Sequence, residues 1–208
     1  MDNKAYLEQI SSEARTTKAS KMPFGLNISP KLLKLLIGGF IAAILIIIIG
    51  AIAGSGGSSE RDYLDKIFLR TANLSSSISD YNKRVKSSEL RSMGNSLNAV
   101  LTETNYSVGN ILKNDFGVSS PNKPANEKTE TEETEWIDGL NQDLENGRLN
   151  GVLDRVYSRD LAYEIGILIS LESETVAKSK NDTVKTSLTS SMDNLSKLYD
   201  QFNDFEAN

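Results

Sequence analysis

The chain contains no cysteine and no histidine among its 208 residues. Without cysteine it forms no disulfide, so every folded part must be held together by packing alone. Without histidine it lacks the commonest general base and the commonest metal ligand. Nucleophile pairs that need histidine and zinc sites built on histidine or cysteine are therefore excluded. Catalysis by carboxylates, lysine or tyrosine stays open, but no motif favours it. We expect no catalytic residue, no cofactor and no metal site.

Other signals are missing as well. The sequence has no glycine-rich phosphate loop, no calcium-loop pattern and almost no alternation typical of strands. From residue 60 onward it carries seventeen basic and twenty-five acidic residues, a net charge of −8. Nucleic-acid surfaces are basic, so this balance argues against a nucleic-acid partner.

One long apolar run stands out against this background. Residues 35–54, LLIGGFIAAILIIIIGAIAG, contain no charged side chain. A helix of this length spans roughly 30 Å, the thickness of the hydrocarbon core of a bilayer. Its twelve Leu, Ile and Phe residues favour insertion by about 4 to 7 kcal/mol. The run predicts a single transmembrane helix.

Charge near the run predicts its orientation. Five basic residues and no acidic residue lie between positions 15 and 34, whereas residues 55–75 hold three of each. Basic residues close to a span stay on the cytoplasmic side. We therefore expect residues 1–34 to form a short cytoplasmic head and the C-terminal part to be extracytoplasmic, joined to the span by a Gly/Ser linker at 55–59.

Two alternatives concern the span itself. Ala51 and Ala53 match the small-x-small pattern of a signal-peptide cleavage site, so a secreted domain cleaved after Ala53 is one alternative. Against it, the apolar stretch is longer than the usual 7–15 residues and more than thirty residues precede it. Gly50 and Gly54 are four residues apart, a spacing that lets membrane helices pack closely, although glycine is common in such helices anyway.

Residues 60–207 are predicted to be all-α. Apolar residues recur there at steps of three and four, which is typical of amphipathic helices. We expect long helices over 60–86, 88–114, 151–180 and from 181 onward, with a short helix beginning near Thr134. The last helix has the most regular heptad: Val184, Leu188, Ser191, Leu195, Leu198, Phe202 and Phe205. These elements predict an antiparallel bundle of four long helices and one short helix, with an intermolecular coiled coil as the alternative.

Residues 117–133 interrupt this pattern. Pro121 and Pro124 disfavour helix, and the stretch that follows them is rich in glutamate. We predict a mobile acidic loop here, most simply a charged linker between the two halves of the bundle, with a contact to a cation or a basic partner as the alternative.

Few side chains qualify as candidate sites. Glu164 lies beside the apolar strip of its helix, where we expect a boundary position paired with Arg155, Arg159 or a lysine of another helix. The alternative is a partly buried carboxylate with a raised pKa that binds a cation or acts as an acid. Glu172 and Glu174 are expected to be surface groups. In the head, Tyr6, Leu7 and Ile10 fall at helical spacing and are candidates for contact with a partner or the membrane.

This layout resembles that of many single-pass bacterial envelope proteins. Our hypothesis is a membrane-anchored structural or interaction protein whose outer bundle docks on an envelope partner, with the bilayer as its other contact and a second copy of the chain as a further candidate. The alternative is a sensor-like bundle that binds a small ligand between its helices. An enzyme is disfavoured.

Overall fold

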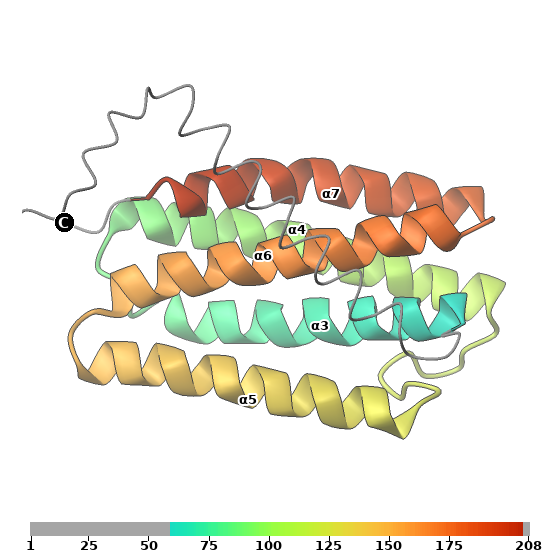
Figure 1. Cartoon of the computed structure of the whole chain (residues 1–208), viewed down its shortest axis with the longest axis horizontal. Coiled ribbons are helices and arrows are strands. Elements are labelled where there is room, and N and C mark those ends of the chain that lie inside the picture. Colours follow the sequence, from blue (N-terminus) through green and yellow to red (C-terminus); the bar gives the residue numbers. More distant parts are fainter. Residues whose placement is uncertain (1–58, 206–208) are drawn as a thin grey trace, which may run out of the picture. The chain divides into compact units, whose positions relative to one another are not determined.

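The computed structural model describes residues 59–205. They form five helices and no strand (Figure 1). The helices are α3 (Glu60–Tyr81), α4 (Ser88–Asp115), α5 (Glu127–Leu149), α6 (Leu153–Lys178) and α7 (Asp182–Asn203). The prediction of an all-helical domain is confirmed for this part of the chain.

The predicted membrane span at 35–54 lies outside the described residues. None of the five described helices is long and apolar enough to cross a bilayer. The head and the Gly/Ser linker up to residue 58 also lie outside the described part.

Four of the helices close into a ring. α3 packs against α4, α4 against α7, α7 against α6, and α6 against α3. Short connections make each consecutive pair in α3–α4 and α6–α7 antiparallel (Figure 1). The four helices enclose an apolar interior. It contains Leu64, Ile67, Leu74, Ile78, Leu90, Leu97, Leu101, Leu112, Leu161, Ile165, Leu168, Val184, Leu188, Leu195 and Phe202.

Several helices begin or end at residues that favour helix termini. The Ser87 side chain accepts a hydrogen bond from the Leu90 amide and begins α4. Asn181 does the same for the Thr183 and Val184 amides at the start of α7. Gly117 adopts a positive φ of 65° just after α4 ends, a conformation that glycine reaches without steric cost.

The helix α5 corrects the prediction of a short helix beginning near Thr134. α5 has 23 residues and begins at Glu127, so the predicted loop ends seven residues earlier than expected. Glutamate is a good helix former, and carboxylates in a first turn complement the helix dipole, so the acidic composition favours helix here. Gly147 lies within α5, where a Cβ would come within 2.9 Å of the Val156 side chain. It permits close packing on α6 and does not end the helix.

A buried ion pair joins α5 to the ring. α5 packs against α3 and α6 on the side away from α4 and α7. Its Glu133 side chain is 1% exposed and accepts two hydrogen bonds of 2.9 Å from the Arg70 guanidinium of α3. The same guanidinium lies 4.3 Å from the centroid of the Trp136 ring. Lys66 reaches Glu133 at 3.8 Å. This contact fixes the register of α5 on α3.

Replacing Glu133 with Ala should therefore destabilise the bundle by about 3 kcal/mol, because Arg70 would be left buried without its partner. The unfolding midpoint should fall by roughly 10 °C in thermal melts followed by circular dichroism. Replacing both residues, as Arg70→Met with Glu133→Leu, should restore most of the loss because no buried charge remains.

The matched control is Glu132→Ala, which removes a half-exposed carboxylate from the same turn and should change stability by less than about 1 kcal/mol. Equal losses for the two alanine variants would show that the Arg70–Glu133 pair does not hold α5.

Candidate functional site

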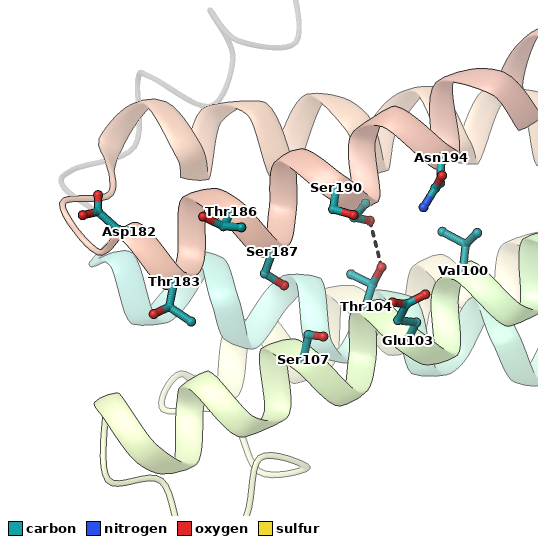
Figure 2. A pocket seen from close by; sticks show the side chains of 11 residues that line it. Val100, Glu103, Thr104, Ser107, Asp182, Thr183, Thr186, Ser187, Ser190 and Asn194 are labelled. Carbon is teal, nitrogen blue, oxygen red and sulfur yellow. Dashed lines mark hydrogen bonds between the residues drawn. The ribbon is translucent and has the colours of Figure 1, made fainter.

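A polar groove runs between α4 and α7 on the side of the ring opposite α5. Three hollows follow one another along it, and the middle one has a volume of about 510 Å³. Figure 2 shows the middle hollow with hydroxyl groups from both helices facing it. Its lining is Val100, Glu103, Thr104 and Ser107 from α4, and Asp182, Thr183, Thr186, Ser187, Ser190, Ser191 and Asn194 from α7.

The two outer hollows lie toward the two ends of the helix pair. One shares Ser107, Thr183 and Ser187 with the middle hollow, and the other is separate from it. One lies where Asn114 and Asp115 of α4 meet Thr183 of α7. The other lies where Glu89 of α4 meets the end of α7 and Phe205. α4 has 28 residues, so the groove follows a helix roughly 40 Å long.

Small side chains on α7 make this groove possible. The heptad places Leu188 and Leu195 in the apolar interior, while Ser187, Ser190 and Asn194 flank that stripe and face α4. Serine and asparagine fill less space than the leucines beside them. The two helices therefore touch along their inner faces and leave a hollow along their outer edge.

A buried hydrogen-bond chain forms the floor of the middle hollow. The hydroxyl oxygens of Thr104 and Ser191 are 2.8 Å apart, the contact drawn as a dashed line in Figure 2. The Ser191 hydroxyl also lies within hydrogen-bond distance of Glu172 on α6, donating to Oε1 at 2.9 Å. This chain links α4, α7 and α6 through the edge of the apolar core.

Glu172 is the most perturbed carboxyl group in the described part of the chain. Its side chain has no exposed surface, and its Oε2 has no hydrogen-bond partner within residues 59–205. Burial raises the pKa of Glu172 to about 8, and the hydrogen bond from Ser191 opposes the shift only in part. The carboxyl group is therefore mainly protonated at neutral pH.

The groove carries charge of one sign. Six carboxylates line the three hollows: Glu89, Glu103, Asp115, Asp182, Asp200 and Asp204. No lysine or arginine is among the described residues that line them. At the rim, Lys185 lies 3.9 Å from Asp182, and Asn181 donates a hydrogen bond of 2.7 Å to Asp115. Glu103 and Asp200 are exposed side chains, so their carboxylates face solvent within reach of an incoming group.

The structure revises the sequence expectations for two carboxyl groups. Glu172 is fully buried and is not the surface group predicted. It follows Ile165 and Leu168 at steps of three and four, which is the apolar face of α6, and that spacing was the signal for its burial. Glu174 instead accepts a hydrogen bond of 2.9 Å from the Tyr63 hydroxyl of α3.

Glu164 does not occupy the boundary position expected for it, and its burial agrees with the alternative reading. It is buried, and burial raises its pKa, while the nearby Trp136 and Arg70 act in the opposite direction. Its predicted partner Arg159 pairs with Asp160 at 2.8 Å. Glu164 therefore belongs to the contact between α6 and α5 and lies apart from the groove.

The other sequence candidates, Tyr6, Leu7, Ile10, Gly50 and Gly54, lie outside the described residues. Within residues 59–205, no group of three or more carboxylates is placed to hold a metal ion. Comparison with known proteins finds no matching family model, no matching curated protein and no matching solved structure.

The raised pKa of Glu172 predicts a pH-dependent stability. The folded state holds the Glu172 proton up to about pH 8, whereas the unfolded chain releases it near the ordinary pKa of 4.5. Between these values the unfolded state binds fewer protons, so the free energy of unfolding falls as pH rises. Relative to Glu172→Gln, the wild type should lose up to about 1.4 kcal/mol per pH unit across this window.

Urea denaturation of both proteins at about pH 5, 6.5 and 8 measures this difference. Glu103→Gln, which removes an exposed carboxylate from the same groove, is the control and should follow the wild-type profile. Parallel profiles for the wild type and Glu172→Gln would mean that Glu172 does not hold a proton in the folded state.

Proposed function

We propose that this chain is a single-pass membrane-anchored envelope protein whose outer helical bundle is an interaction module that docks on a partner protein. The observation that carries the proposal is the groove between α4 and α7, which runs the length of the bundle and has charge of one sign. A face of this extent suits a macromolecular partner better than a small ligand. The apolar run at 35–54 and the basic residues before it support the anchor and its orientation.

The build of the bundle supports a docking role as well. Its apolar interior is closed by four helices, so α4 and α7 need no further cover on their outer edge to complete the core. The chain has no histidine or cysteine, and Glu164 and Glu172, whose pKa values are raised, are buried in helix contacts. These features favour binding over catalysis.

A sensor-like, ligand-binding bundle is the second candidate. The middle hollow has a volume of about 510 Å³, within the range of roughly 300 to 1,000 Å³ typical of small-molecule sites. Such sites are mostly apolar and bury most of their ligand, whereas this hollow is open and lined by hydroxyl and carboxylate groups. A secreted helical domain, produced by cleavage after Ala53, would keep the same docking face.

The anchor predicts a clear fractionation result. Ile44→Lys with Ile47→Lys places two charges near the centre of the run, each at a cost of about 3 kcal/mol. That cost offsets most of the insertion energy, so the variant should move from the alkaline-washed membrane pellet to the soluble fraction. Ile44→Leu with Ile47→Leu keeps the apolar character and should stay in the pellet. A soluble wild-type protein of reduced mass would instead establish cleavage.

Docking itself is tested by a mild-detergent pull-down from native membranes with a C-terminal tag. The proposal expects one or more envelope proteins to be recovered in stoichiometric amounts, and the intact mass of the bait to include residues 1–53. A bait recovered alone at every detergent concentration contradicts docking. A melting-temperature shift with a small-molecule library would then favour the ligand-binding alternative.

A further inference from the structure

We infer that the groove between α4 and α7 receives a basic helix of the partner protein, with a lysine or arginine side chain seated over Thr104 and Ser191. This inference rests on the proposed docking function and names the docking surface and the chemistry of the partner. Four observations support it: the charge of the groove, its length, the position of Glu172, and the way the bundle already accommodates α5.

The negative charge of the groove favours a basic partner. Six carboxylates line the three hollows without a lysine or arginine among the lining residues. An acidic partner, or a second copy of this face, would bring like charges together in a partly desolvated contact, which is unfavourable. A basic segment places opposite charges along the same line, and it is steered toward the groove during encounter.

The length and shape of the groove favour a helix as the bound segment. The hollows extend along the whole antiparallel pair, a distance far longer than a small molecule. The lining side chains of α7 in the middle hollow are all small or short, from Thr183 to Asn194. Ridges of an incoming helix can therefore enter the groove between two helices, which is the ordinary mode of helix packing.

The bundle already contains one such arrangement. α5 packs against both α3 and α6 on the opposite side of the ring. Its Glu133 meets Arg70 and Lys66 of α3, so a carboxylate of the added helix is held by bases of the ring. On the α4–α7 side the carboxylates belong to the ring, so the added helix must supply the bases.

The buried Glu172 lies one hydrogen bond away from the lining of the middle hollow. Its Oε1 accepts the hydrogen bond from Ser191, which lines that hollow, and its Oε2 has no partner among the described residues. A cationic group seated on the Thr104 and Ser191 hydroxyls can donate hydrogen bonds to their oxygens. Its positive charge would favour ionisation of the Glu172 carboxyl group, which is mainly protonated without it.

The probe is a synthetic helical peptide of about 20 lysine, alanine and leucine residues, with a matched peptide in which glutamate replaces lysine. The full chain, in lipid nanodiscs, is titrated with each fluorescent peptide at physiological salt, and binding is followed by anisotropy. The lysine peptide should bind and the glutamate peptide should not. Glu103→Lys with Asp200→Lys should weaken lysine-peptide binding by at least about tenfold, because two groove carboxylates become bases.

The control is Glu130→Lys with Glu135→Lys, which makes the same change in net charge on exposed positions of α5. It should leave binding within about twofold. Equal weakening by both variants would mean that the peptide responds to net charge alone and would overturn the groove assignment. A photoreactive residue in place of Ser187 should cross-link to the bound lysine peptide. A cross-link from that position to residues 15–34 of the same chain would overturn both the inference and the proposed membrane orientation, since the chain's own basic segment would then occupy the groove.

The same variants separate this inference from the docking function. If the partner recovered with the wild type is lost from Glu103→Lys with Asp200→Lys and kept by the α5 control, the groove is the docking surface. If both variants keep the partner, docking stands and the groove inference fails. Circular dichroism of both variants checks that the bundle is intact.

Discussion

The apolar interior enclosed by α3, α4, α7 and α6 is the constraint on which the rest of the structure depends. The chain has no disulfide to supplement it, so the relative positions of these helices are fixed by packing. Each of the four helices meets two neighbours in the ring. Burial of large side chains such as Leu64, Ile165 and Phe202 supplies the driving force. Polar side chains are consequently confined to the edges of this interior and to the outer faces.

The two outer edges of the ring have opposite characters for this reason. On the α3–α6 side, Arg70 and Lys66 face outward and α5 covers them with Glu133 and Trp136. A buried guanidinium requires such a partner, because a charge that is removed from water without one is strongly destabilising. On the α4–α7 side the outward groups are carboxylates and hydroxyls, most of which remain in contact with water. That edge therefore needs no covering helix to satisfy buried charge.

Sequence periodicity predicted the four helices of the ring well, but not their neighbours, and it predicted the added helix poorly. The α7 heptad, including Ser191 at a buried position, follows directly from a 4-3 spacing that only one helix face can satisfy. α5 has no such stripe in its first half. Its position depends on the long-range pair between Glu133 and Arg70, 63 residues apart in the chain, and local spacing carries no information about such a contact. The groove was unpredictable for the same reason, since it requires knowing which helices are neighbours.

Glu172 joins the stability of the bundle to its outer groove. A carboxyl group with an unpartnered oxygen in an apolar interior weakens the fold, and a leucine of similar size at this position would be neutral or stabilising on packing grounds. The position lies where α6, α7 and α4 converge, and Ser191 connects it to the hollow that is open to solvent. A cation seated in the hollow, as proposed, would favour the ionised form of Glu172, and ionisation would in turn strengthen the attraction for that cation. The proposed binding in the groove would then be thermodynamically linked to the protonation of Glu172 at the edge of the core.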